Sequence, residues 1–346
     1  MSDSASISPH NISSLWYTRC PVPTATGIAL DKGWLRESLL NKGIQLHSLR
    51  DAPEENVRSA HFNHNLHGLF REGGNIPAIW ARSRGQDTVV VGLTWVDEAQ
   101  FILVRPESQI TSAADLAGKT LALPLRPDDT IDFARAMALH GYVSVLASQG
   151  LSLKDVTIRE FKAGPTRFTQ GHNDTKPWRD VIADALLEDR VDAIYAKGAQ
   201  AVALQREHGL RIIADINAFT DQKFKINNGT PRPVTVDRLF AQTRPDLVAH
   251  YLAVLQRAAV WAKTHEEQVF EIVGRETNTT AADAFAAYGP ALPQSLEIRL
   301  EPEWINALEI QKNFLLHHGF INTDFDIHEW IDPRPLREAS SLSIAA

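Results

Sequence analysis

Two stretches, ITSAADLAGKTLALP (110–124) and ALLEDRVDAIYA (185–196), decide the fold that we expect for this chain. In the first, Ser112 and Asp115 have the spacing of a helix-capping box, Gly118 ends the short helix, and an apolar strand follows. In the second, an amphipathic helix leads into another short apolar strand. Helices that alternate with short buried strands predict an α/β protein.

The alternation continues on both sides of these two stretches. Apolar runs predict two buried strands upstream, joined by a turn at Asp97-Glu98, and further strands and helices downstream. The expected strands cover 88–96, 101–105, 156–161 and 211–216, and the expected helices cover 131–149 and 198–209. A segment with several Gly and Pro residues (224–236) then returns the chain, and three helices that start near Pro245, Thr264 and Pro302 close it.

An α/β unit inserted into a second one predicts two lobes connected by two crossover strands. We expect residues 16–104 and 220–346 to form the first lobe and residues 105–219 to form the second. Residues 1–15 are mostly polar and predict a disordered leader. Such a protein closes on a small ligand in the cleft between its lobes.

Composition excludes several classes of protein. The 346 residues contain one cysteine, so neither an internal disulfide nor a Cys-rich zinc site is expected. The net charge is −7 and the basic residues are scattered, which argues against a nucleic-acid surface. No segment approaches the roughly 20 apolar residues of a membrane span. The N-terminus has Asp3 where a signal peptide needs basic residues, and no lipoprotein signal precedes Cys20, so we expect a cytoplasmic location.

Cys20 lies in RCPVPTATGIALDKGWL (19–35), where two prolines stiffen the chain before a helix that Thr24 or Thr26 can cap. The thiol would therefore lie just before a helix N-terminus, where unpaired N–H groups and the helix dipole favour a thiolate or an anionic ligand. The alternative is that Cys20 is a small buried apolar residue.

Arg71 opens the second candidate segment, LFREGGNIPAIWARS (69–83). Pro77 lies near the start of a helix that Asn75 could cap, so Gly73 and Gly74 would form a loop that presents backbone N–H groups. A neighbouring guanidinium adds two parallel donors suited to a sulfonate, sulfinate or carboxylate. The alternative is a solvated surface arginine paired with an acidic neighbour.

His61 ends VRSAHF (57–62), which we expect to be extended and to lead into a loop, and His64 and His67 follow at intervals of three. This arrangement does not fit a metal site, because no Cys, Asp or Glu accompanies the histidines at a ligand spacing. A role for His61 in hydrogen bonding or proton transfer needs a partner, and Cys20 or a ligand oxygen could supply one. We expect most of the aromatic side chains to pack in the core and one or two of them to line the cleft.

The two stretches quoted first resemble the type II periplasmic-binding-protein fold, particularly its sulfonate, taurine and nitrate binders. These proteins have a DL-x-GK helix that opens the second lobe and a G-x-VDA strand that closes it; here Glu188-Asp189-Arg190 replaces the usual glycine. The resemblance implies a two-lobe α/β fold with the ligand cleft between lobes that two crossover strands join.

Three motifs together resemble the 2'-hydroxybiphenyl-2-sulfinate desulfinase family, which uses this fold for catalysis. They are Cys-Pro-Val-Pro at Cys20, His-Phe at His61, and Arg-x-Gly-Gly-x-Ile-Pro at Arg71. The resemblance implies that Cys20, His61 and Arg71 are catalytic. It also implies that the Gly74 N–H contacts the sulfinate, and we expect Gly73, Phe62 and Asn75 to be further substrate-binding residues.

The resemblance implies cleavage of the C–S bond of an aryl or alkyl sulfinate with release of sulfite, without metal or cofactor. Cys20 would either attack sulfur as a thiolate or protonate the departing carbon as an acid. The segment FNHNLHGLF (62–70) is richer in His and Asn than in the family, so the resemblance supports C–S chemistry more than a biphenyl substrate.

A protein that binds a small sulfonate, sulfinate or carboxylate anion without turnover is the alternative, and only this alternative would need an ABC-transporter partner. It accounts for every feature except Cys20 beside His61 and Arg71. Enzymes that make the pyrimidine of thiamin are a third class on this fold. The cysteine, histidine and lysine pattern expected of them is not visible in this sequence. In either main case we expect a monomer that binds a small organic anion in the cleft.

Overall fold

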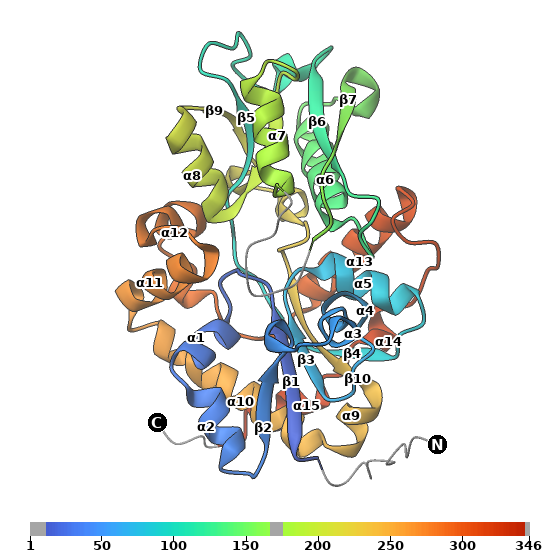
Figure 1. Ribbon diagram of the computed structural model, residues 1–346, viewed down its shortest axis with the longest axis vertical. Coiled ribbons are helices and arrows are strands. Elements are labelled where there is room, and N and C mark those ends of the chain that lie inside the picture. The colour runs from blue at the N-terminus through green and yellow to red at the C-terminus, as the bar shows by residue number, and fades with distance from the viewer. Residues whose placement is uncertain (1–11, 167–175, 343–346) are drawn as a thin grey trace.

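The computed structural model describes residues 12–166 and 176–342, and they form two lobes, one above the other in Figure 1. We call the part built on a five-stranded sheet lobe 1. Its strand order is β2-β1-β3-β10-β4, with β1 parallel to β2 and β3 and with β10 antiparallel to β3 and β4. The strands are β1 (Ser14–Arg19), β2 (Gln45–Ser48), β3 (Leu69–Glu72), β4 (Thr88–Thr94) and β10 (Arg232–Asp237).

Lobe 2 contains the remaining strands, in a three-stranded sheet of order β8-β5-β9 and a parallel pair of β6 and β7. A parallel bridge between Leu121 and Ala193 brings β6 beside β8. The strands are β5 (Gln100–Val104), β6 (Thr120–Leu125), β7 (Thr157–Lys162), β8 (Ile194–Lys197) and β9 (Arg211–Asp215). The carboxyl ends of β1, β3, β6 and β8 are therefore available to one cleft, as ligand sites of α/β proteins require.

Helices cover the sheets of both lobes. Those from the first half of lobe 1 are α1 (Ala25–Asp31), α2 (Trp34–Leu40), α3 (Glu55–Arg58), α4 (Ala60–Asn63) and α5 (Asn75–Ser83). Those of lobe 2 are α6 (Phe133–Ser148), α7 (Trp178–Leu187) and α8 (Gly198–His208). Short 3-10 turns are η1 (Leu49–Asp51), η2 (Ala113–Leu116), η3 (Leu153–Asp155), η4 (Ile216–Ala218), η5 (Gln222–Lys225) and η6 (Leu292–Gln294).

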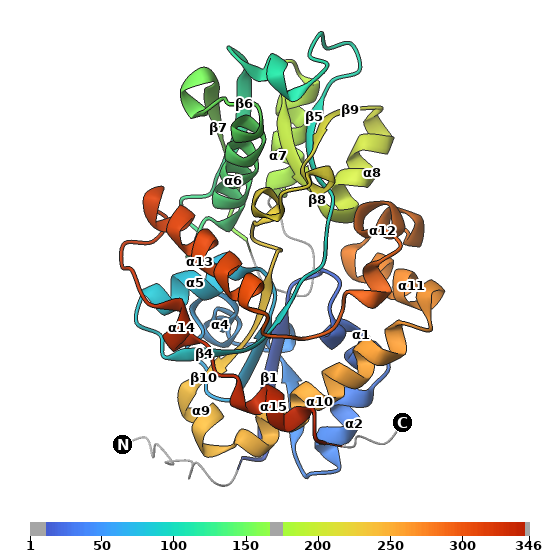
Figure 2. The ribbon, with the colours of Figure 1, turned by 180° about the vertical axis from the view of Figure 1, so that it is seen from behind.

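The C-terminal helices return to lobe 1, and α10, α13 and α15 cover its face in Figure 2. They are α9 (Arg238–Thr243), α10 (Pro245–Ala262), α11 (Glu266–Thr277), α12 (Ala281–Tyr288), α13 (Pro302–His317), α14 (Ile327–Trp330) and α15 (Arg334–Ala339). In α10, Val248, Leu252 and Leu255 recur at helical spacing and are fully buried. This apolar stripe fixes α10 against α1 and α15. None of the helices in the described ranges is both long and apolar enough to span a membrane.

The prediction that a turn at Asp97-Glu98 joins two neighbouring strands is wrong. The strands on either side of it, β4 and β5, do not pair, because β4 lies beside β10 in lobe 1 and β5 lies between β8 and β9 in lobe 2. Residues 95–99 therefore cross from one lobe to the other, and the chain crosses back between β9 and β10. The capping box of Ser112 and Asp115 is confirmed at the start of η2. The pairing of β5 with β8 and β9 places residues 100–104 in lobe 2 and not in lobe 1 as expected, whereas the boundary at 219 stays a prediction.

Two local expectations need correction. Residues 1–11 of the expected disordered leader (1–15) lie outside the described residues. The last two residues of that leader, Ser14 and Leu15, are ordered in β1, and Leu15 is fully buried. The segment VRSAHF is not extended, since it contributes to α3 and α4. Val57 is its only β-branched residue, and acidic Glu55 in the first turn of α3 favours a helix start, which explains the helical outcome.

Candidate active site

Cys20 follows the last residue of β1, and backbone hydrogen bonds hold it against β3. Its N–H donates to the Glu72 carbonyl at 3.2 Å. Thr24 caps α1 by accepting from the Gly27 N–H at 3.0 Å, so the expectation that the thiol lies just before a capped helix is confirmed. A Cβ at Gly73 would lie 2.5 Å from Cys20 Sγ, and only a glycine therefore lets the second loop pass directly behind the thiol.

His61 on α4 joins the thiol to the interior of lobe 1. Its Nε2 lies 3.9 Å from Cys20 Sγ, and its Nδ1 lies 2.7 Å from Thr18 Oγ1. Thr18 precedes Cys20 by two residues, so the alternation of a strand turns both side chains toward the same face and toward His61. Burial lowers the pKa of His61 well below 6.5, and the charge of Arg71 lowers it further. His61 is therefore a neutral imidazole at neutral pH.

The other two histidines, His64 and His67, have different hydrogen-bond partners from His61. His64 adopts a left-handed backbone conformation, with φ of 55°, and its Nδ1 contacts the Phe62 carbonyl at 3.2 Å. His67 pairs with Asp237, the last residue of β10, at 2.8 Å. Across residues 12–166 and 176–342, no group of three or more His, Cys, Asp and Glu side chains is arranged to hold a metal ion.

Arg71 on β3 is fully buried behind this pair. Its Nε donates to the His61 carbonyl at 2.9 Å, while Nη1 and Nη2 are buried and have no hydrogen-bond partner among the described residues. Burial lowers the pKa of Arg71, and the nearby Cys20 opposes that shift, so thiol and guanidinium are close enough to interact. A buried charged donor without an acceptor is costly to the fold, which is a mark of a site arranged for a ligand.

The loop after Arg71 leads into α5, whose N-cap is Gly74 and not Asn75 as expected. Asn75 is the first helical residue, and its Nδ2 donates to the carbonyls of Asn227 at 2.8 Å and Pro231 at 3.0 Å. Its side chain thus ties α5 to the segment before β10. Gly74 itself lines the cavity described next, whereas Gly73 and Asn75 do not reach it.

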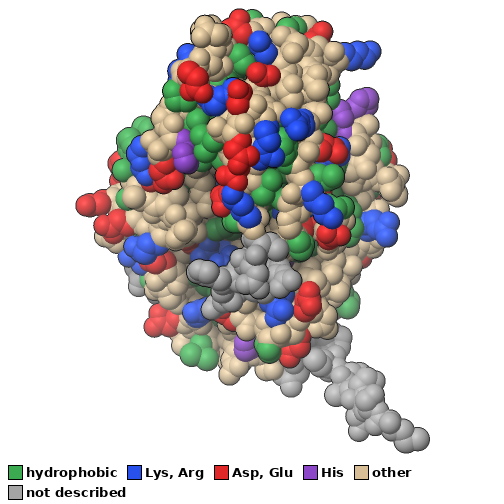
Figure 3. All heavy atoms as spheres, turned by 45° about the horizontal axis from the view of Figure 1, so that its top comes forward, with side chains coloured by type: hydrophobic (Ala, Val, Ile, Leu, Met, Phe, Trp, Pro, Cys, Tyr) green, Lys and Arg blue, Asp and Glu red, His purple; other side chains and the backbone are tan. Residues whose placement is uncertain are grey.

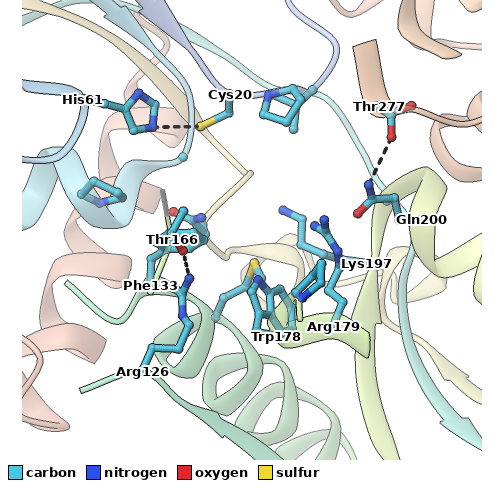
Figure 4. A pocket seen from close by; sticks show the side chains of 18 of the residues that line it. Cys20, His61, Arg126, Phe133, Thr166, Trp178, Arg179, Lys197, Gln200 and Thr277 are labelled. Carbon is cyan, nitrogen blue, oxygen red and sulfur yellow. Dashed lines mark hydrogen bonds between the residues drawn. The ribbon is translucent and has the colours of Figure 1, made fainter. Parts of the chain in front are cut away.

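The cavity occupies about 450 Å³ between the lobes, a size usual for small-molecule sites. Lobe 1 contributes Cys20, His61, Phe62, Gly74 and Asn228 to its wall. The wall from lobe 2 includes Arg126, Phe133, Trp178, Arg179 and Lys197, and Figure 4 shows Trp178 and Arg179 across the space from Cys20. Arg71 is absent from the wall and lies behind it. The structure thus brings Cys20, His61 and Arg71 together at one end of an interlobe cavity.

The side walls are aromatic. Phe62 of lobe 1 stacks on Phe133 of lobe 2 with ring centroids 6.3 Å apart, and Phe62 also packs edge-on against His61 at 4.8 Å. Trp178 is half-buried, packs against the apolar cores and borders the same space. Flat apolar walls beside a polar end favour a ligand with an aryl group and an anionic head.

Sequence reasoning missed the lobe 2 wall and the Thr18 contact. Arg126 follows β6 directly and Lys197 ends β8, and both positions are carboxyl ends of parallel strands, where α/β proteins bind ligands. That signal was present in the sequence. Nothing in the sequence indicated that Thr18 would contact His61, because a helix in place of the expected strand determines where His61 points.

Comparisons with known proteins agree with this architecture. No protein-family model matches the chain. It is 24% identical over 357 residues to the 2'-hydroxybiphenyl-2-sulfinate desulfinase of Rhodococcus erythropolis, an alignment that covers 94% of this chain and 93% of the relative.

Solved structures show the same fold. A cysteine-to-serine mutant of the desulfurization enzyme DszB, in complex with biphenyl-2-sulfinic acid, superposes with a TM-score of 0.73 at 22% identity, and the match covers 94% of this chain and 98% of that one. The periplasmic aliphatic sulphonate-binding protein SsuA of Escherichia coli gives a TM-score of 0.68 at 16% identity, over 93% of this chain and 92% of that one. The predicted type II periplasmic-binding-protein fold is therefore confirmed, and the chain is similar over nearly its full length to the 2'-hydroxybiphenyl-2-sulfinate desulfinase.

Proposed function

We propose that this protein hydrolyses the C–S bond of an organic sulfinate and releases sulfite. The observation that carries the proposal is the convergence of a partly exposed thiol, a neutral imidazole 3.9 Å from it, and a buried guanidinium with two unsatisfied nitrogen atoms. A binding site for an anion needs the guanidinium but has no need of the thiol–imidazole pair. The desulfinase named above is a relative with the fitting activity.

The sulfinate oxygens would take the donors that the protein leaves without acceptors. Arg71 has Nη1 and Nη2 to offer, and the Gly74 N–H at the start of α5 donates to no described residue. Charge-assisted hydrogen bonds of this kind are short and strong, and they hold a sulfinate with its sulfur toward Cys20. Such donors also stabilise the charge that shifts onto the sulfur oxygens as the C–S bond breaks.

The overall reaction needs only water. A sulfinate anion and one water molecule give the hydrocarbon and hydrogen sulfite, so no electron donor or acceptor enters the balance. In one route the Cys20 thiolate attacks sulfur, the carbon leaves with a proton, and water then releases sulfite from the S–S adduct. In the other route the Cys20 thiol gives its proton to the carbon, sulfur dioxide departs, and water converts it to hydrogen sulfite and returns the proton.

His61 would handle the Cys20 proton in either route. In the tautomer whose Nδ1–H donates to Thr18 Oγ1, Nε2 directs its lone pair toward Cys20 Sγ. Because His61 is neutral at neutral pH, this lone pair is available without prior deprotonation. The distance of 3.9 Å is long for a proton transfer, and catalytic contacts of unliganded enzymes commonly shorten when substrate binds.

The test is sulfite release from a panel of aryl and alkyl sulfinates, including biphenyl-2-sulfinate and benzenesulfinate. Sulfite production by the wild type and its loss in Cys20→Ser would support the proposal. Binding of these compounds by both proteins without any sulfite would reject it. The Ser variant is the matched control because it changes one atom at a half-buried position and leaves Arg71 and Gly74 unchanged.

The second candidate function is binding of an organic sulfonate without turnover. The similarity to the sulphonate-binding protein SsuA favours it, since that protein shares the fold across most of both chains. Under this alternative Arg71 and Gly74 would bind the head group and Cys20 would only border the cavity. Equal affinity of wild type and Cys20→Ser for sulfonates, together with no reaction of any sulfinate, would establish it.

A further inference from the structure

The charged side chains that line the cavity are all cationic. They are Arg50, Arg126, Lys176, Arg179 and Lys197, and the described part of the wall includes no Asp or Glu. The chain as a whole carries a net charge of −7, so this is a strong local departure from its average. Four of the five belong to lobe 2 and lie across the cavity from the sulfinate donors of lobe 1. Lys176 is already paired with Asp184, and Lys197, Arg179 and Arg126 differ in how far their charges are compensated.

Lys197 belongs to a buried cluster that keeps an excess positive charge. Its Nζ lies 2.6 Å from Glu98 Oε1, and the other Glu98 oxygen accepts from Arg232 at 3.1 Å. Burial favours the protonated form of Glu98, but the two cations outweigh it and hold the pKa of Glu98 below its usual range. One carboxylate thus serves two cations, and the remaining charge faces the cavity through Lys197.

Arg179 forms no ion pair within 4.0 Å among the described residues, although the charge of the neighbouring Asp180 acts on it, and it projects into the same space (Figure 4). It is the second residue of α7, and the positive end of the helix dipole disfavours a cation there. Helix stability therefore gives no reason for an arginine at this position. An anion in the cavity would satisfy both Arg179 and the N-terminal N–H groups of α7, which no side chain caps.

Arg126 contributes a donor to the same wall. Two carboxylates, Asp129 at 2.9 Å and Asp132 at 3.4 Å, compensate its charge, and its guanidinium lies 4.4 Å from the centre of the Phe133 ring. Its Nη2 nevertheless is buried and has no hydrogen-bond partner among the described residues. A buried, unsatisfied guanidinium nitrogen at the cavity wall indicates a place for an acceptor that the ligand supplies.

We propose that the ligand of this cavity is a dianion: an aryl sulfinate with a second acidic group, a carboxylate or sulfonate, that Arg179, Lys197 and Arg126 bind from lobe 2. This inference rests on the proposed function for the sulfinate end. The aryl part would lie between the aromatic walls, with the sulfinate at Cys20 and the second anion at the opposite end. A ligand that contacts cations of both lobes would also hold the lobes closed.

The experiment compares benzenesulfinate with its three carboxylated isomers, which differ only in the added charge and its position. We expect at least one isomer to exceed benzenesulfinate in kcat/KM for sulfite release by about tenfold, the usual effect of a charge-assisted contact. Arg179→Gln should remove this advantage, so kcat/KM should fall by a larger factor for the carboxylated isomer than for benzenesulfinate. Arg337→Gln is the matched control, because Arg337 is exposed on α15 and has no part in the cavity.

Calorimetry with benzenesulfonate and the three sulfobenzoates separates this inference from the proposed function. Tighter binding of a sulfobenzoate that Arg179→Gln abolishes supports the second subsite, even if no sulfinate reacts. Sulfite release that is equal for charged and uncharged sulfinates, and unaffected by Arg179→Gln, overturns the subsite and leaves the proposed function standing. A loss for benzenesulfonate as large as for the sulfobenzoates also overturns it, because Arg179 would then bind the single head group.

Discussion

Cys20 Sγ lies 3.9 Å from His61 Nε2, although 41 positions separate the two residues in the sequence. Parallel pairing of β1 with β3 and the short helix α4 create this proximity, and Thr18 Oγ1 fixes the imidazole from its other side at 2.7 Å. The pair faces a cavity between the lobes, with the buried Arg71 guanidinium behind it. The chemistry proposed for the protein depends on this arrangement.

Thr18→Val tests whether the orientation of His61 matters. Valine has nearly the same shape but cannot hydrogen-bond to Nδ1, so the imidazole loses its anchor and its tautomer preference. We expect kcat/KM for sulfite release to fall by about tenfold, with a smaller change in KM. Thr18→Ser, which restores the hydroxyl, should recover most of the activity. Full activity in the valine variant would show that Thr18 does not position His61.

Arg71→Met separates a ligand-binding role from a structural one. Methionine removes a buried charge with two unsatisfied nitrogens, so the unliganded protein should gain about 1 kcal/mol in free energy of unfolding. The affinity for benzenesulfonate should fall by about 100-fold, and the ligand should no longer protect Cys20 from alkylation. Urea titrations and alkylation rates measure the two effects. A marked loss of stability, with protection retained, would assign Arg71 to the fold alone.

The low pKa of His61 predicts the acid side of the pH profile. Burial and Arg71 disfavour the imidazolium, so His61 stays neutral until the pH falls well below 6.5. Activity that needs neutral His61 should therefore be constant around neutral pH and decline only well below 6.5, as kcat/KM measured from about pH 5 upward would show. An acid limb centred at 6.5 or above would contradict the buried, neutral imidazole.

Glu276 gives a prediction about stability. Burial raises its pKa from 4.5 to about 7, although Arg19 lies 2.7 Å away. A carboxyl with a raised pKa binds more protons in the folded state, so its contribution falls as the pH rises from 4.5 to 7. The wild type should lose on the order of 3 kcal/mol of unfolding free energy through Glu276 over this pH range, and the Glu276→Gln variant should not. The stability of the variant relative to the wild type should therefore increase between pH 5 and pH 8. A constant difference in unfolding free energy would show that Glu276 is ionised throughout.

Much of the fold could be predicted because its signals are local. The capping box of Ser112 and Asp115 and the Gly118 stop depend on residues within one turn, and the structure has them as predicted. The pairing of strands is not local, and the two apolar runs on either side of Asp97 look like a hairpin although they belong to different sheets. The distinction depends on β10, more than 130 positions later, which takes the place beside β4.

The candidate site divides in the same way. Cys20 before a capped helix and Gly74 at the start of another could be identified from short motifs. In lobe 2, the positions of Arg126 and Lys197 at strand ends could be read from the sequence, but the gathering of the cations opposite Cys20 depends on how the lobes face each other, which no window of sequence contains. Acidic and basic side chains are interspersed on the face shown in Figure 3. The overall charge of the chain therefore did not indicate that cations gather inside the cavity.

Sulfite release tests the central claim most directly. Purified protein is incubated with benzenesulfinate, biphenyl-2-sulfinate and the carboxylated benzenesulfinates, and both sulfite and the desulfinated arene are counted per molecule of protein. Multiple turnovers with sulfite and arene in equal amounts, lost in Cys20→Ser while sulfonate affinity persists, are the result predicted by the convergence of Cys20, His61 and Arg71. Tight binding of these compounds with no sulfite above the Cys20→Ser background would contradict it and leave a binding protein.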